Sequence, residues 1–152
     1  MQEKFDICLI SISKEVIIGI YENGKQIKAM KDTGKTSDIL PSMLYKILNT
    51  YKIENIFYAN GPGNFSAIKL THIFLKTLSI TLNTNVYCAN SFYFTNDLYI
   101  NAYGKIHFMK NGNDINTVVL EYVHDTIFDL PQRIDINKFQ TDCTPLYILP
   151  AL

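Results

Sequence analysis

The sequence has no excess of charge of either sign, because Lys and Arg together number 14 and so do Asp and Glu. Domains that hold nucleic acid by their own electrostatics usually carry a marked basic excess, so this balance argues against direct RNA or DNA binding. No apolar run approaches the roughly 18 residues that a membrane span needs. The first six residues are polar and mixed in charge, which differs from a secretory signal. We therefore expect a cytoplasmic protein without a membrane anchor.

Cysteine and histidine are both scarce. Cys8, Cys88 and Cys143 are odd in number and widely spaced, and no pair has the spacing of a zinc site. They suit a reducing compartment better than a disulfide framework, so we expect them to be small buried hydrophobic side chains. The histidines are His72, His107 and His124. Since no two of them have ligand spacing on one helix, we expect no metal site and no catalytic site of the chain's own.

Turn signals and hydrophobic periodicity predict an alternating order of elements over the first two thirds of the chain. The expected strands are residues 5–12, 16–21, 26–31, 53–59 and 85–89. The first expected helix begins between Ser37 and Leu40 and runs to Tyr51, and the second runs from Asn64 or Phe65 to Leu82. Asn23-Gly24 is the hairpin turn between the second and third strands. Thr36, Ser37 and Asp38 offer capping oxygens for the first helix. This order favours a mixed five-stranded sheet with flanking helices.

The remaining residues predict a smaller unit. The expected elements are strands at 97–102, 105–109, 117–122 and 145–149, with one short helix within 124–136. About 55 residues are few for an independent core. We therefore divide the chain into residues 1–96 and a smaller second lobe, residues 97–152, that leans on the first.

The turn before the second helix carries the most informative motif. Gly61 and Gly63 permit a sharp reversal, Pro62 stiffens it, and Asn64 or Ser66 can cap the helix. A glycine-rich turn at a helix N-terminus could also hold a phosphate. However, Pro62 donates no N–H, and no lysine and hydroxyl pair of a P-loop follows. A packing turn is the better interpretation.

This turn and the element order resemble the TsaB (YeaZ) family of bacterial threonylcarbamoyladenosine-biosynthesis proteins, over about residues 5 to 95. The family hallmark is Gly-Pro-Gly-Ser-Phe-Thr-Gly-Leu-Arg-Ile-Gly; here Gly61, Pro62, Gly63 and Phe65 match, and Lys69 is a near equivalent. The resemblance implies an actin-like ATPase (ribonuclease-H-like, ASKHA) fold, with a mixed five-stranded sheet, flanking helices and a reduced second lobe.

The resemblance also implies a function. The chain would be a non-catalytic subunit of the complex that makes N6-threonylcarbamoyladenosine at position 37 of tRNA, binding and supporting the catalytic TsaD subunit. ATP and metal would belong to the partner subunits, among them a TsaE-like ATPase. The tRNA would be bound only through the complex, and the chain alone could form a homodimer.

One departure bears on catalysis. The family's first strand ends in Asp-Thr-Ser or Asp-Thr-Ala, where this sequence has Ile10-Ser11-Ile12-Ser13. In related ATPases and kinases an acidic residue there helps to position metal and phosphate, so its loss favours a non-catalytic protein. The alternative is a stand-alone actin-like phosphotransferase or metallopeptidase-like enzyme, although the chain lacks the His-x-x-x-His motif of TsaD.

Both predicted helices carry wide apolar stripes, and in the family the corresponding helices form a bundle with those of TsaD. The expected partner-binding residues are Leu40, Met43, Leu44, Ile47, Ile68, Thr71, His72 and Leu75. We expect charged substitutions at Met43 and Thr71 to abolish the heterodimer while the monomer stays folded. The alternative is that both stripes pack on the sheet.

Overall fold

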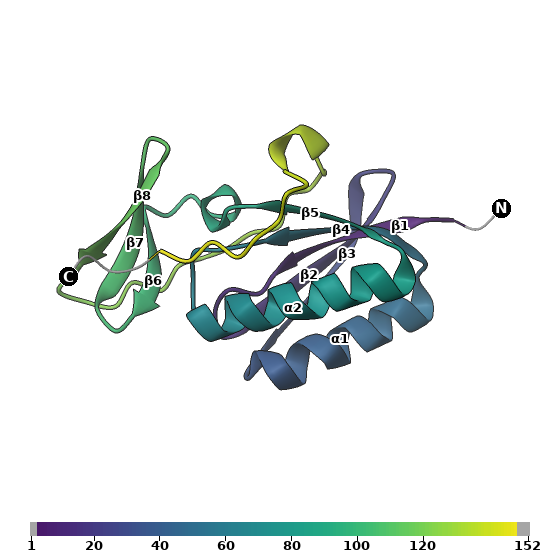
Figure 1. Ribbon diagram of the computed structural model, residues 1–152, viewed down its shortest axis with the longest axis horizontal. Coiled ribbons are helices and arrows are strands. Elements are labelled where there is room, and N and C mark those ends of the chain that lie inside the picture. The colour runs from purple at the N-terminus through teal and green to yellow at the C-terminus, as the bar shows by residue number, and fades with distance from the viewer. Residues whose placement is uncertain (1–2, 149–152) are drawn as a thin grey trace.

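The computed structural model describes residues 3–148. Its main sheet contains β1 (Phe5–Ile10), β2 (Glu15–Glu22), β3 (Lys25–Thr33), β4 (Ile53–Ala59) and β5 (Asn85–Ala89). The strand order is β3-β2-β1-β4-β5, as Figure 1 shows. β1 pairs antiparallel with β2 and parallel with β4, and β5 continues the parallel half. Both residues of the Asn23-Gly24 turn have positive φ. The predicted mixed five-stranded sheet is confirmed.

Two helices, α1 (Thr36–Thr50) and α2 (Phe65–Leu82), cover one face of this sheet (Figure 1). The expected capping of α1 is wrong, because Lys35 is the cap residue and no side chain caps the helix. The helix begins at Thr36, so the expected start between Ser37 and Leu40 is wrong, and Pro41 is the sixth residue of the helix, in its second turn. In α2, the side-chain oxygen of Asn64 accepts a 3.1 Å hydrogen bond from the Ala67 N–H, so the expected cap is confirmed.

A second sheet of three antiparallel strands follows in the order β6-β7-β8. Its strands are β6 (Tyr99–Tyr103), β7 (Ile106–Asn111) and β8 (Asp114–Val119). β8 begins three residues earlier than expected because the turn at Gly112-Asn113 is tight. Short 3-10 turns occur at η1 (Ser91–Phe94) and η2 (Ile136–Lys138). The helix expected within 124–136 is wrong, as is a strand at 145–148; Leu149 lies outside the described residues.

Residues 128–139, here called the return segment, pack on the sheet face opposite the helices. The N–H of Gln26 donates to Gln132 O at 2.9 Å, and the N–H of Ile134 donates to Gly24 O at 2.8 Å. The hydroxyl of Tyr21 donates to Pro131 O. Apolar side chains of the segment then cover the core beneath it; they are Phe128, Leu130, Ile134 and Phe139. Residues of the expected second lobe therefore complete the core of the first sheet.

The cysteines depart from expectation. Cys88 on β5 forms a disulfide with Cys143, so the prediction that all three are free thiols is wrong. The sequence gives no local signal for this pair, because the two are 55 residues apart and meet where the chain after the return segment passes β5 at the Gln140–Cys88 bridge. Cys8 is free and completely buried, as expected, and burial raises the pKa of its thiol.

No helix within residues 3–148 combines the length and the apolar character that a membrane crossing requires.

Candidate partner surface and inter-sheet cleft

The predicted partner residues lie mostly inside the chain's own core. Seven of the eight are at most 7% exposed, so they form no free surface: Leu40, Met43, Leu44, Ile47, Ile68, Thr71 and Leu75. Their side chains pack between the helices and the sheet, because the helix face toward the strands is the apolar one. A charge at Met43 or Thr71 would be buried in the monomer itself, so it would destabilise the fold as well as any contact with a partner. The effect of these substitutions on a heterodimer stays a prediction.

His72 is the one expected partner residue that is partly exposed. Its Nδ1 lies 3.1 Å from the hydroxyl oxygen of Tyr58, whose own pKa is raised to about 12 by burial. Partial burial, with a smaller contribution from nearby Lys76, lowers the pKa of His72. The neutral ring can accept the tyrosine hydrogen bond, which makes His72 a structural residue at the edge of the helix layer.

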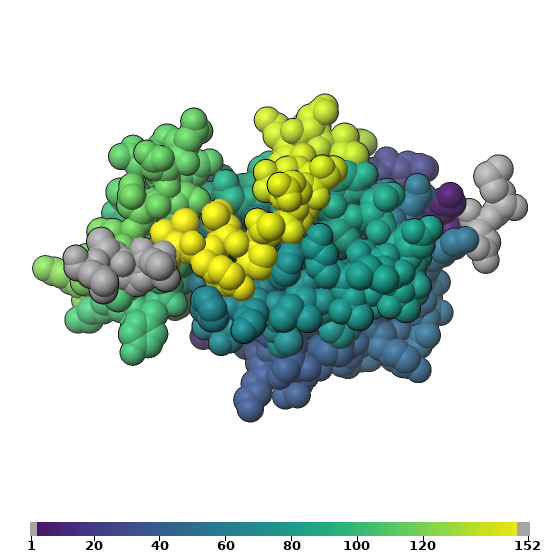
Figure 2. Space-filling view, in the orientation of Figure 1, coloured from purple at the N-terminus to yellow at the C-terminus, as the bar shows by residue number. Residues whose placement is uncertain are grey.

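The outward face of α2 carries a different set of residues, here called the α2 stripe. It consists of Phe65, Lys69, Ile73, Lys76 and Ile80, at a spacing of three or four residues along one helix face. Phe65, Ile73 and Ile80 are 58%, 52% and 82% exposed, and both lysines are exposed. Figure 2 shows α2 on the open surface of this side of the molecule. The stripe is hard to predict from the sequence because α2 is apolar on several sides.

The motif turn packs tightly against its neighbours. A Cβ atom on Gly61 would lie 2.5 Å from Leu146 O, and one on Gly63 would lie 2.5 Å from Ile12 O. The N–H of Asn64 donates to Ile12 O at 2.7 Å, so this donor faces the chain itself. Glycine is needed at both positions for close backbone approach. This geometry supports the packing turn and disfavours a phosphate cradle, while Lys69 belongs to the α2 stripe.

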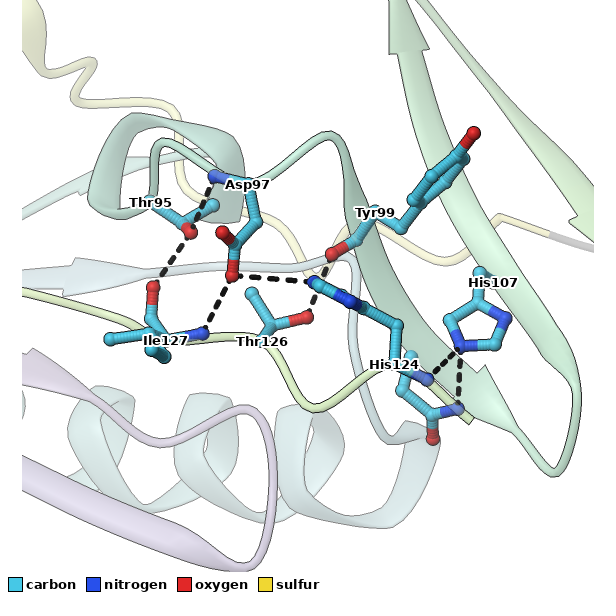
Figure 3. Close-up of polar contacts among 8 residues, drawn as sticks. Thr95, Asp97, Tyr99, His107, His124, Thr126 and Ile127 are labelled. Carbon is cyan, nitrogen blue, oxygen red and sulfur yellow. Dashed lines mark hydrogen bonds and ion pairs between the residues drawn. The ribbon is translucent and has the colours of Figure 1, made fainter. Parts of the chain in front are cut away.

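A cleft of about 530 Å³ lies between the two sheets. Its walls include the loop after β1, the cap of α2, the middle of β6 and the chain after β8, represented by Lys14, Asn64, Asn101, His124 and Thr126. In its wall, His124 Nε2 lies 3.4 Å from Asp97 Oδ2 (Figure 3). This is an ion-pair distance without hydrogen-bond alignment, since the buried Nε2 has no hydrogen-bond partner among the described residues.

Polar contacts around this pair connect residues 124–127 to Asp97, β6 and β7. Asp97 Oδ2 accepts the Ile127 N–H at 2.8 Å, and the Thr126 hydroxyl donates to Tyr99 O at 2.7 Å (Figure 3). His107 is completely buried, and its Nε2 accepts the His124 N–H at 2.9 Å. Its Nδ1 lies 2.8 Å from Lys105 O and is therefore assigned the proton. His107 is a satisfied structural histidine, as expected.

The cleft offers limited chemistry of its own. Within residues 3–148, no three His, Cys, Asp or Glu side chains converge to hold a metal ion. Within residues 3–148, no hydroxyl or thiol forms a hydrogen bond with His124 Nε2. The Asp97 carboxylate and the His124 imidazole therefore lack the nucleophile of a catalytic triad. The arrangement does hold residues 124–127 against β6.

Comparison with solved structures identifies the fold. No family model and no curated protein matches the sequence. A solved structure described as an uncharacterized protein with similarity to peptidase YeaZ from Pseudomonas aeruginosa superposes with a TM-score of 0.61 and 12% identity, covering 82% of this chain and 70% of that one. YeaZ from Pseudomonas aeruginosa superposes with a TM-score of 0.57 and 12% identity, covering 90% and 70%. The chain therefore has the actin-like (ASKHA) fold of the YeaZ structures.

Proposed function

We propose that this chain is a non-catalytic interaction subunit of the bacterial tRNA N6-threonylcarbamoyladenosine modification complex, in which it binds and supports a catalytic TsaD-like subunit. The α2 stripe carries the proposal, because it is an exposed apolar and basic helix face on a fold shared with YeaZ structures. A soluble monomer gains nothing from three large apolar side chains on one helix face, whereas a helix-to-helix contact buries them.

The stripe also indicates the chemistry of the partner. Lys69 and Lys76 flank Ile73, so a partner helix that presents apolar residues with flanking carboxylates would be complementary. On α1, the exposed Tyr45 (69%) is the large apolar side chain that could extend the contact. We assign ATP, metal and tRNA contacts to the partner subunits, including a TsaE-like ATPase, and we place the complex in the cytoplasm.

Titration of the chain with the TsaD-like protein of the same organism tests the proposal. Ile73→Glu should weaken binding by at least about 100-fold, because a charge buried at a helix interface costs several kcal/mol. Ile27→Glu is the matched control, since Ile27 on β3 is 48% exposed and Ile73 is 52% exposed. It should bind like the unchanged chain. Equal affinity of both variants would contradict the α2 surface.

A second measurement separates the proposal from a stand-alone enzyme. We expect the isolated chain to show no turnover with ATP and Mg²⁺ in a calorimetric titration, and no peptidase activity. A tRNA nucleoside assay should show loss of threonylcarbamoyladenosine when the Ile73→Glu variant replaces the native chain in cells. Metal-dependent hydrolysis that persists through purification and disappears on mutation of this chain would overturn the non-catalytic assignment.

A further inference from the structure

We propose that residues 140–148, here called the clasp segment, form a redox-controlled clasp over the N-terminal end of the α2 stripe. The segment continues from the return segment and lies on the surface beside α2, where it is yellow in Figure 2. The Cys88–Cys143 disulfide joins it to β5. Oxidation would hold the clasp closed, and reduction would release it.

Few other interactions hold the clasp segment. Gln140 forms a two-way backbone bridge with Cys88, at 2.8 and 2.9 Å. Further along, the side-chain amide of Asn60 donates to Thr144 O at 2.8 Å, and the Leu146 N–H donates to Asn60 O at 2.8 Å. Beyond the bridge at Gln140, residues 141–148 contain no helix or strand. The two hydrogen bonds to Asn60, the bridge at Gln140 and side-chain packing oppose the conformational entropy that the segment regains once the cross-link is cut.

The clasp segment covers the part of α2 where the stripe begins. The ring of Tyr147 packs against that of Phe65, with a centroid distance of 4.6 Å. Phe65 is the first residue of α2 and of the stripe. Leu146 meanwhile lies against Gly61 in the motif turn. A closed clasp therefore occupies surface that a helical partner would otherwise contact at this end.

The redox step is an ordinary thiol–disulfide exchange. A dithiol reductant supplies two electrons and two protons, the bond between Cys88 and Cys143 breaks, and two thiols form while the reductant becomes a disulfide. Both cysteines are at most 3% exposed, so a reductant must enter through local opening. A cavity of about 750 Å³ borders Cys88, Gln140 and Thr144 and provides the approach. In reducing compartments, where we expect this chain to work, disulfides are usually transient and redox-sensing.

The consequence for binding rests on the proposed function. With the clasp closed, Tyr147 covers part of the Phe65 ring, which is 58% exposed; with the clasp open, the covered part also becomes available to the partner. We expect the reduced chain to bind the TsaD-like protein about 10-fold more tightly, the effect of one additional partly buried aromatic ring.

The clasp itself is tested on the isolated full chain. Under denaturing conditions the oxidised chain should take up one maleimide, at Cys8, and the reduced chain three. Hydrogen exchange at residues 144–148 and at the first turn of α2 should accelerate on reduction, while β2 stays protected. Three reactive thiols after treatment with a disulfide oxidant, or exchange that is unchanged by reduction, would overturn the clasp.

Variants then separate the clasp from general stability. Tyr147→Ala keeps the disulfide and should raise the affinity of the oxidised chain to that of the reduced chain. The double variant Cys88→Ser with Cys143→Ser should bind tightly with or without reductant, whereas Cys8→Ser keeps the redox dependence. Identical affinity of the two redox states would overturn the regulation. Absence of binding in both states would instead refute the proposed function, and hydrogen exchange would still decide the clasp.

Discussion

The two faces of the main sheet are covered in different ways. On one face, α1 and α2 bury Ile7 and Leu9 of β1 in a core shared with the helices. On the other, the return segment covers Cys8 and Ile10, the alternate residues of the same strand. One face thus has a regular cover close in sequence, and the other has an irregular cover that comes from more than 100 residues away.

The two covers also differ in the interactions that keep them on the sheet. The helices satisfy their own backbone groups and need only an apolar stripe to dock. The return segment has internal backbone hydrogen bonds at the turn of residues 135–139, and elsewhere its backbone bonds to the β2–β3 hairpin. The clasp segment that follows it is joined to β5 by the Gln140 bridge and by the disulfide. The irregular cover should therefore be the more sensitive to loss of a single cross-link.

The largest expected effect is that of the cross-link. Reduction of the Cys88–Cys143 disulfide, or Cys143→Ser, should lower the free energy of unfolding by about 4 kcal/mol, because the bridge closes a ring across 55 positions of the chain. Urea unfolding with and without a thiol reductant measures this. The double serine variant should be insensitive to the reductant. Coincident unfolding curves of the native chain in both conditions would show that the second cover does not depend on the bridge.

A core substitution on the helix-covered face should cause the second largest loss of unfolding free energy. Leu44→Ala should destabilise the chain by about 3 kcal/mol, since Leu44 is 1% exposed at the centre of the helix-side core. Leu98→Ala is the matched control, because Leu98 is 71% exposed, and its change should stay within about 0.5 kcal/mol. Thermal unfolding of both variants provides the comparison, and equal losses would contradict the assigned core.

The return segment should show a smaller packing effect. Phe139 is partly buried and packs against Phe57 with a ring-centroid distance of 4.9 Å. Phe139→Ala should therefore lower stability by about 2 kcal/mol, less than a fully buried aromatic ring would. Chemical unfolding of the oxidised chain measures it. A loss greater than that of Leu44→Ala would reverse the ranking of the two faces.

A pH effect at His72 should be the smallest. Its pKa in the folded chain is lowered, so the unfolded chain binds more protons near the ordinary value of about 6.5. The stabilising contribution is complete above that value and is lost as the pH falls through the lower, folded pKa. We expect this contribution to be the smallest of the four, because partial burial and, to a smaller degree, Lys76 cause the shift in a side chain that is partly exposed to solvent. In stability measurements between pH 7 and 5, His72→Gln should remove this part of the slope, and an unchanged slope would assign it to other groups.

Sequence periodicity predicted the main sheet and its helices well, because each element carries its own signal. β4, β5 and α2 have the expected bounds, and the Asn23-Gly24 turn specifies the β2–β3 hairpin. The return segment has no repeating pattern, because its residues meet the sheet through an irregular backbone. Its place, and with it the Cys88–Cys143 bridge, depends on contacts distant in sequence.

The predicted partner residues lie on the sides of α1 and α2 that pack in the core, whereas the exposed α2 stripe lies on another side of α2. Apolar residues such as Leu44 and Ile68 gave the strongest periodic signal, and the strongest signal marks the face that packs on the sheet. Ile73 and Ile80 interrupt a mostly polar face, which is a weaker pattern. The available clue was Ile73 between Lys69 and Lys76, with Ile80 one turn further along the same face of α2. Partner binding at this face stays a prediction.

The late position of the return segment also bears on biosynthesis. The ribosome completes β1 to β5 before it adds residues 128–139, and at about 5 to 20 residues per second the interval after β5 is roughly 2 to 10 s. During this time one face of the nascent sheet, with Ile10, Tyr21 and Phe57, has no cover. Such a face is a binding site for chaperones that recognise exposed apolar surface. Yield in cells should therefore respond to chaperone supply and to translation speed over residues 90–140.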